Sequence, residues 1–357
     1  WQGLVGKTVT GADLTALGRK IADRYNAAGY ALINVQVPPQ DFAGGIVRVV
    51  VQEGHVEKVE IEGNTAGADL MLLKHYAAKI IADRPLRRST LERYILLMND
   101  IPGLKVGSRF EPVPGHPGVA GLRLTILRKR VEAGLAVNNQ GSGQLGATQA
   151  TVNLVANGLL REGERTQVAF GAPITLKRYQ YYGLSHVEPI GHDGATLTFG
   201  YGRLVTHPQA GTAGGTADTF TVRLSYPVIR AVRETLVLNA DANALNSNAA
   251  YLGQGISDER TRSLRIGAIY GREDDWNGTT IVSGTFSHGF DTLGARRGSV
   301  AFGGPDYAKV YGAVAREQKL PLDMVLRARV MGQYATHHLP STEQFLSSPP
   351  PELIAVR

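Results

Sequence analysis

Three short patterns in the 357-residue sequence contain residue types that could bind a cofactor or a metal ion. Residues 141–146 have the glycine spacing GxGxxG, His337 and His338 are adjacent, and so are Asp274 and Asp275. A dinucleotide-binding loop must open a helix whose N-terminus faces the phosphate, but strand-like residues follow here. Neighbouring side chains of a strand point to opposite faces, so neither pair can easily chelate one ion. We therefore expect a hairpin loop at 141–146, a turn at the aspartates, no metal site and no cofactor.

The composition narrows the class of protein further. The chain has no Cys, which excludes a disulfide framework and a thiolate metal site. Its net charge is +7, but Lys and Arg are spread along the chain, so we expect no nucleic acid partner. No apolar run approaches the roughly 18 residues of a membrane-spanning helix. No Ser, His and Asp set has an esterase signature, so we expect neither an enzyme nor a small-molecule substrate.

From about residue 130 onward, apolar and polar residues alternate, with turn residues between the runs. In one run, Phe220, Val222, Leu224 and Tyr226 alternate with polar residues. A period of two is typical of strands that have one apolar face. We expect about eleven such strands, several close to the roughly ten residues that a membrane strand needs. The sequence thus predicts a large antiparallel sheet over residues 130–345.

Two features favour a transmembrane barrel for this region. The polar face carries charges and many glycines, as a water-filled lumen does. Short turns are expected to alternate with long polar loops, the turns near 188–191, 227–230 and 319–321, and the loops at 206–217, 246–260 and 290–305. Short turns at one rim and long loops at the other are typical of outer-membrane barrels. A soluble all-β binding domain or enzyme remains the alternative, because it would also show one apolar face.

The polar face supplies candidate lumen-lining residues. They are polar or charged side chains distributed along the expected strands, namely Asn153, Gln167, Arg223, Asn239, Arg265 and Arg327. Such side chains could give a passing chain a wet and weakly adhesive surface. They could equally stabilise the barrel interior through hydrogen bonds and ion pairs, and both roles stay open.

Residues 1–129 differ in kind and divide into two segments. In the first, 1–54, Thr10–Asp13 resembles a capping box, a helix follows until Gly29, and two strands are expected within residues 31–52. The second, 55–129, has the order strand, helix, helix, strand, strand. Its helices are expected at 68–82 and after another capping box at Ser89–Glu92. The first segment looks like the second half of the same β-α-α-β-β unit.

In the second unit, the strand at 104–110 is expected at an edge of the sheet, beside the first helix. An exposed edge can bind an extended chain through backbone hydrogen bonds, by adding a strand. Val106 and Phe110 could offer side-chain pockets and Arg109 a charge. These three residues are candidates for binding a partner protein, and the alternative is that they only build the core.

The residues also resemble those of a known family, the two-partner secretion transporters that export haemolysins and filamentous haemagglutinins. The similar segments occur in the same order as in that family, at Tyr25–Tyr30, Val37–Gln40, Val51–Gly54, Leu97–Gly103, Val137–Ser142, Ser225–Pro227 and Leu339–Phe345. By this resemblance, residues 1–54 are the C-terminal part of a first POTRA domain, 55–129 are a second POTRA domain, and 130–345 are part of the barrel.

The resemblance implies an α+β pair of POTRA domains followed by an antiparallel transmembrane β-barrel. It implies an outer-membrane location, with the POTRA domains in the periplasm and the barrel in contact with outer-membrane lipid. The implied activity is the export and activation of one large β-helical partner protein, without a nucleotide or other cofactor. A haemolysin, an adhesin and a contact-dependent toxin remain equally open as the partner.

The sequence also departs from the family pattern. A signal peptide, a plug helix and the front half of the first POTRA domain are not seen, and residues 346–357 form an atypical tail. We therefore expect an incomplete barrel, whose unpaired strand edges would cost several kcal/mol per unsatisfied group in lipid. This polypeptide alone is then not expected to be a working transporter. A barrel-assembly protein, which shares POTRA domains and a barrel, is the second alternative.

Overall fold

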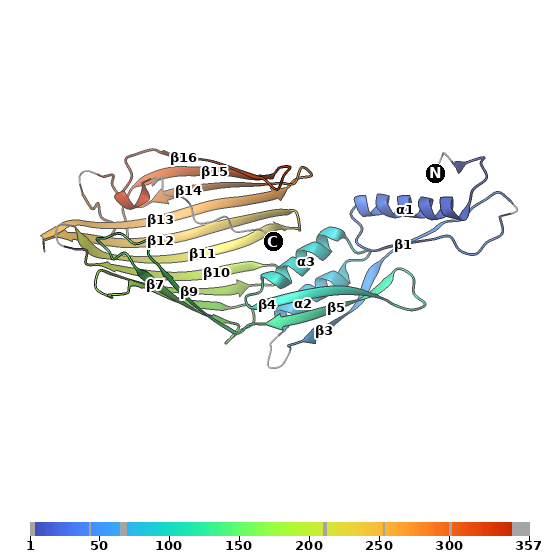
Figure 1. The fold of residues 1–357 in the computed structure, drawn as a ribbon, viewed down its shortest axis with the longest axis horizontal. Helices are drawn as coiled ribbons and strands as arrows, with labels where there is room; N and C mark the ends of the chain where they lie inside the picture. The colour runs from blue at the N-terminus through green and yellow to red at the C-terminus, as the bar shows by residue number, and fades with distance from the viewer. Residues whose placement is uncertain are drawn as a thin grey trace.

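The computed structural model of the protein describes residues 4–42, 44–64, 70–209, 213–252, 254–299 and 302–344. Figure 1 shows an elongated arrangement in which a large sheet occupies one end, α1 (Gly11–Ala27) the other, and two further helices lie between them. The predicted fold class is confirmed, since a small α+β region precedes one large antiparallel sheet. The expected atypical tail at 346–357 lies outside the described residues.

The N-terminal segment has the predicted order of helix, strand, strand. Thr10 and Asp13 cap α1 reciprocally, each side chain bonding the backbone N–H of the other, as predicted. Gly29 has a φ of 87°, which ends the helix in a conformation that other residues rarely adopt. The chain then forms the hairpin of β1 (Ile33–Gln36) and β2 (Val50–Glu53).

The next unit has the predicted order strand, helix, helix, strand, strand. Its elements are β3 (His55–Gly63), α2 (Met71–Ala82), α3 (Arg88–Asp100), β4 (Leu104–Pro112) and β5 (Val119–Arg128). β5 lies in the middle of the sheet, parallel to β3 and antiparallel to β4. The helices pack on one face around fully buried side chains such as Leu73, Met98 and Leu124. The predicted start of the first helix, Ala68, lies outside the described residues.

The second predicted capping box is wrong. α3 begins at Arg88, and its N-cap residue, Arg87, makes no side-chain cap. The Glu92 carboxylate instead accepts hydrogen bonds from the Arg88 side chain and from the backbone N–H of Val232 in the large sheet. A distant contact therefore uses the carboxylate that the local pattern assigned to a cap.

Within the described residues, no helix is both long and apolar enough to cross a membrane.

Eleven strands form the large sheet, each paired antiparallel with its neighbours in sequence order. They are β6 (Val131–Asn138), β7 (Gln149–Asn157), β8 (Arg165–Pro173), β9 (Tyr179–Ile190), β10 (Ala195–Thr206), β11 (Gly214–Arg230), β12 (Glu234–Tyr251), β13 (Gln254–Glu273), β14 (Gly278–Gly289), β15 (Tyr307–Lys319) and β16 (Val325–Ala335). The number of strands agrees with the prediction. The outermost strands, β6 and β16, do not pair with each other in the described structure, so the sheet is open.

The predicted loop 206–217 and the predicted turn 227–230 are partly wrong, because β11 includes residues 214–217 and 227–230. The predicted loop 246–260 is wrong over most of its length. Residues 246–260 belong mostly to β12 and β13, which pair up to Tyr251 and Gln254. Polar residues occupy both faces there, as in the neighbouring pairs Asn246–Arg260 and Ser247–Glu259. The backbone therefore pairs where the sequence has no apolar alternation to reveal a strand.

One face of the large sheet is apolar and uncovered. The register places Phe199 opposite Val222, and Ile266 opposite Phe286, on this face. Ile266 is 66 % exposed and Val330 75 % exposed. No helix or second sheet within the described residues packs against the middle of this face. A soluble protein rarely exposes so large a contiguous apolar surface, so the face needs an apolar environment.

The helices of the small unit are held against the turns at one rim of the large sheet. Arg93 of α3 donates hydrogen bonds to the carbonyl oxygens of Pro227, Val228 and Asp193, at 2.9, 3.1 and 3.2 Å. Arg230 makes a bidentate ion pair with Asp100 at the end of α3, at 2.7 and 2.8 Å. These charge-assisted bonds join residues at least a hundred positions apart in sequence and fix the helices to the rim.

Two further contacts support this arrangement. The carboxylate of Glu162, in the turn between β7 and β8, accepts hydrogen bonds from the N–H groups of Leu72 and Leu73 at the start of α2. A carboxylate at a helix N-terminus satisfies free donors and complements the helix dipole. His75 of α2 stacks on His192 of the next turn, with ring centroids 3.8 Å apart.

Asp193, in the turn between β9 and β10, takes part in several of these contacts. Its carboxylate accepts hydrogen bonds from the hydroxyls of Tyr94 and Tyr226, at 3.2 and 2.9 Å. Burial by itself raises the pKa of Asp193, but the bond from Tyr226 and the charge of Arg93 outweigh it. Together they hold the pKa below its ordinary value of 3.8.

We predict that Arg93→Ala loosens the helices from the rim by about 2 kcal/mol, because three carbonyl oxygens lose a charged donor. The sequence lacks Cys, so spin labels can be attached at Lys79→Cys on α2 and Trp276→Cys on a rim turn. The distance distribution between the labels should broaden. Arg84→Ala is the matched control, since Arg84 is exposed and its side chain bonds the carbonyl oxygen of Ile81 in α2; equal broadening in both variants contradicts the prediction.

The same label pair tests the role of Asp193. A folded pKa below 3.8 means that the ionised carboxylate stabilises the docked helices above that pH and stops doing so as the pH falls through the folded value. Acidification from about pH 5 to about pH 3 should therefore broaden the distribution in the wild type. In Asp193→Asn the distribution should already be broader at pH 7 and change less on acidification, and an identical acid response would refute this role.

Candidate functional site

The polar face of the large sheet carries all six of the predicted lumen-lining residues. The cross-strand register places Arg223 opposite Asp241, Asp241 opposite Arg265, and Arg327 opposite Glu317, all on the face opposite the apolar one. By the same alternation along β7, β8 and β12, the side chains of the other three predicted residues, Asn153, Gln167 and Asn239, lie on this face. The structure therefore brings the six onto one surface, whereas their contact with a passing chain stays a prediction.

Most of these residues have partners on the same face. Arg223 pairs with Asp241, Arg327 Nε with Glu317 Oε2 at 2.8 Å, and the Ser225 hydroxyl donates to Asn239 at 2.7 Å. Such cross-strand pairs stabilise a sheet by fractions of a kcal/mol each. The surface is thus charged but internally balanced, which fits both the structural and the lining role.

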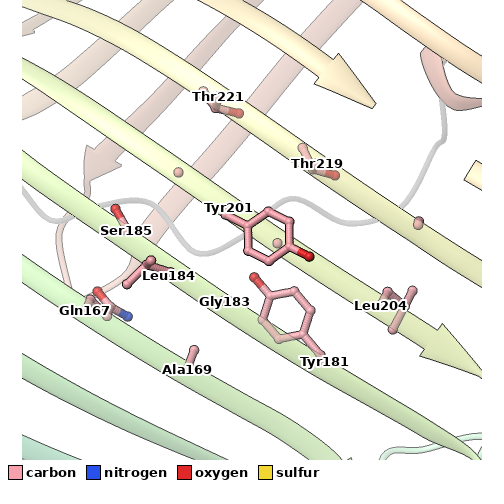
Figure 2. Close-up of a pocket in the computed structure, with 13 residues that line it drawn as sticks. Gln167, Ala169, Tyr181, Gly183, Leu184, Ser185, Tyr201, Leu204, Thr219 and Thr221 are labelled. Atoms are coloured by element: carbon pink, nitrogen blue, oxygen red, sulfur yellow. The ribbon is translucent and has the colours of Figure 1, made fainter. Parts of the chain in front are cut away.

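A shallow depression of about 550 Å³ lies on this polar face, across β8 to β11. Figure 2 shows Tyr181 among the side chains that line it, beside Gly183. A Cβ atom at Gly183 would lie 2.9 Å from the Tyr181 hydroxyl oxygen, and one at Gly202 3.7 Å from the ring. The Tyr181 ring therefore lies over Gly183 and Gly202. The depression forms where these glycines have no side chains.

Two carboxylates hold the segment after β16 against the polar face, and the first of them is Glu259 of β13. Glu259 is 2 % exposed and accepts hydrogen bonds from the N–H and hydroxyl of Ser341 and from the N–H and hydroxyl of Thr342. These residues form a short 3-10 helix, Ser341–Glu343. Sequence reasoning missed Glu259, because it fell within the predicted loop 246–260.

A second carboxylate fixes the same segment. Glu343 pairs with Arg265 of β13, at 2.6 Å, and with Lys309 of β15. Arg265, predicted as a lumen-lining residue, is thus committed to holding this segment. The segment consequently covers part of the polar face near the rim that is farthest from the helices (Figure 1).

β4 is an edge strand, as predicted, but it lies beside α3, the second helix of its unit, and not beside the first. Val106 is 8 % exposed and belongs to the core, Phe110 is half-buried against that core, and Arg109 is exposed. The Asn99 side chain bonds both the N–H and the carbonyl of Val106, at 2.9 and 3.1 Å. Binding of a partner by Val106, Arg109 and Phe110 remains a prediction.

The free part of this edge is therefore short. Backbone groups of alternate residues in a strand point to the same side, so Ser108 and Phe110 point outward as Val106 does. In the described part of the chain their outward groups have no hydrogen-bond partner. An added strand has these backbone groups available, but not those of Val106.

The three sequence patterns that were rejected as cofactor or metal sites lie outside the strands. Residues 141–146 lie in the loop between β6 and β7, and Asp274 and Asp275 lie in the turn after β13, as predicted. His337 and His338 follow β16. The predicted hairpin and turn are confirmed.

Comparisons with known proteins decide the family. A family model described as the haemolysin secretion/activation protein ShlB/FhaC/HecB matches residues 126–348, which is more than half of the chain. This chain belongs to that family. A ShlB-type POTRA domain model matches residues 1–54 as well. The ShlB/FhaC/HecB assignment excludes both alternatives, the barrel-assembly protein and the soluble all-β domain.

Individual relatives agree with this assignment. The chain is 22 % identical over 362 residues to the heme/hemopexin transporter protein HuxB of Haemophilus influenzae strain 86-028NP, covering 96 % of this chain and 62 % of HuxB. The chain thus spans less than two thirds of the length of that relative. CdiB from Escherichia coli has a similar fold, with a TM-score of 0.73 at 17 % identity, over 96 % of this chain and 66 % of CdiB. CdiB from Acinetobacter baumannii gives 0.61 at 17 % identity, over 96 % and 64 %.

Members of the ShlB/FhaC/HecB family are outer-membrane transporters, not enzymes, and their POTRA domains lie in the periplasm. The predicted outer-membrane location is therefore confirmed. The rim that holds α2 and α3 is then the periplasmic rim, and the exposed apolar face is the one that meets lipid.

We predict that Glu259→Gln releases the segment 339–344 from the polar face. A neutral amide cannot accept all four hydrogen bonds, and the loss should be about 2 kcal/mol, or about 30-fold faster amide hydrogen exchange in the segment. Glu317→Gln is the matched control, since it alters a carboxylate of the same face whose partner Arg327 is 69 % exposed. Unchanged exchange in Glu259→Gln, or an equal increase in the control, would show that Glu259 does not hold the segment.

Proposed function

We propose that the protein exports a large partner protein across the outer membrane, as part of a two-partner secretion pair. The observation that carries this proposal is the two-sided sheet, with an uncovered apolar face and an opposite face of charges and glycines. A wall of this kind separates lipid from an aqueous passage. HuxB, a transporter by name, supports the proposal, and export uses the folding of the partner and no cofactor.

The proposal assigns a role to each segment. Residues 1–54 and 55–129 are the end of a first and the whole of a second POTRA domain, and residues 130–345 belong to the barrel wall. The second domain is docked on the periplasmic rim through Arg93 and Arg230, which supports a role in delivering the partner to the passage. The polar face then offers weak contacts to the chain in transit.

We further propose that the partner arrives unfolded and adds a strand to β4. Backbone hydrogen bonds can bind an unfolded β-helical protein, because they recognise an extended backbone and do not depend on a particular sequence. Ser108 and Phe110 provide the free backbone groups, and Arg109 is exposed beside them. Val106 contributes to the core behind the strand.

Replacing one backbone donor tests this route. Ser108→Pro removes an outward N–H that β5 does not use, and Ser108→Ala keeps it. Each substitution is introduced into the chromosomal gene, so that the protein is tested as its host makes it. We expect the partner to be a large secreted protein encoded beside this gene, and its amount is measured in the culture medium. Ser108→Pro should reduce secretion by about tenfold, from the loss of about 1.4 kcal/mol of capture, and Ser108→Ala should not.

Deleting the gene provides the reference for complete loss of export. Secretion that persists after the deletion refutes the proposed function itself. Secretion that is lost on deletion but unchanged by Ser108→Pro refutes only capture at β4. Membrane levels of both variants are compared by heat-dependent migration in SDS, so that a folding defect is recognised.

A further inference from the structure

Three potential metal ligands meet at the periplasmic rim, away from the polar face and from β4. Glu164 lies in the turn before β8, and His186 and Glu188 lie on β9. One ligand atom from each residue lies within 4.8 Å of those of the other two. Glu164 is 3 % exposed, and the side chains of His186 and Glu188 are 33 % and 21 % exposed. The group is therefore largely removed from bulk water.

Each of the three side chains is held by a second partner. The backbone N–H of Leu160 donates to Glu164 Oε1 at 2.7 Å. The guanidinium of Arg161 donates to Glu188 Oε1, also at 2.7 Å. Partners of this kind orient metal ligands, and their removal weakens metal binding. Both contacts use Oε1, so Oε2 of each carboxylate is the atom that would bind a cation.

His186 is oriented in the same way. Its Nδ1 lies 2.9 Å from the hydroxyl oxygen of Thr166 on β8. Its Nε2 faces Oε2 of Glu188 at 3.6 Å. When Nδ1–H donates to Thr166, Nε2 carries a lone pair and can bind a cation. With neutral His186, the two carboxylates and Arg161 sum to a negative charge, which attracts a cation.

We propose that Glu164, His186 and Glu188 bind a divalent transition-metal cation, for which Zn²⁺ is the natural probe. One imidazole nitrogen and two carboxylate oxygens suit zinc, and a water molecule completes four ligands. Ligands at roughly 2.0–2.2 Å from a tetrahedral zinc ion lie about 3.3–3.6 Å apart. The side chains therefore need to close by about 1 Å, which rotamer adjustments can supply.

The site would stabilise the junction between the two parts of the protein. The turn that carries Glu164 also carries Glu162, whose carboxylate caps α2 through Leu72 and Leu73. A cation that ties this turn to β9 would therefore also fix the residue that holds α2. This role does not depend on the export of a partner. Without a cation, Glu188 forms an ion-pair network with Arg161 and His186, and Glu164 accepts a hydrogen bond from Leu160; this is the competing explanation.

Zinc titration of the purified full chain tests the proposal. The untagged protein in detergent micelles is first treated with EDTA and then titrated calorimetrically with ZnCl₂. We expect one saturable site in the wild type. His186→Ala and Glu188→Gln should each weaken zinc binding at least about tenfold, and Thr166→Val, which removes an orienting partner, by about tenfold. His337→Ala is the matched control, because His337 is exposed after β16 and far from the site in sequence.

A second measurement identifies the ligands. The zinc X-ray absorption spectrum of the loaded wild type should show one imidazole among oxygen ligands, and His186→Ala should lose the imidazole signal. Heat-dependent migration in SDS shows whether each variant is folded. Absence of saturable zinc binding in the wild type, or equal binding by folded His186→Ala, would overturn the proposal and leave the ion-pair network.

Discussion

The structure depends on the contact of one apolar sheet face with a non-aqueous surrounding. Side chains such as Ile266 and Val330 are largely exposed, and no described element covers the face that they share. A hydrocarbon surrounding offers no hydrogen bonds, so each backbone group in the wall must be paired with a neighbouring strand. Antiparallel hairpins between consecutive strands satisfy this requirement with the shortest connections. The opposite face is then free to carry charges that would be costly in lipid.

The hairpin turns at the periplasmic rim have a second role, because they hold the helical unit. Glu162, Asp193 and Val232 lie in three successive turns, and each contacts α2 or α3. The contacts use charged side chains and backbone groups at the edge of the wall. The effective dielectric constant there is lower than in bulk water, so these charges interact more strongly. The orientation of the second unit therefore follows from the barrel turns and not from a linker.

The repeating local patterns could be predicted from the sequence, while the contacts between distant segments could not. Alternation along the chain predicted the sheet and its two faces, and the spacing of Thr10 and Asp13 predicted the start of α1. The capping box at Ser89 failed because Glu92 bonds a backbone group 140 residues away. The strands across 246–260 were missed because both of their faces are polar. Glu259 and Glu164 were missed for a related reason, since their partners come together only after the strands have paired.

The short free stretch of β4 limits how firmly any strand can be held there. Asn99 already occupies the backbone of Val106, and Pro112 at the other end has no N–H to donate. An incoming segment can therefore form only a few ladder bonds before it meets an occupied or donorless position. So few hydrogen bonds favour rapid dissociation of a bound segment over a long bound lifetime. A long polypeptide could therefore move past β4 in successive steps without becoming trapped.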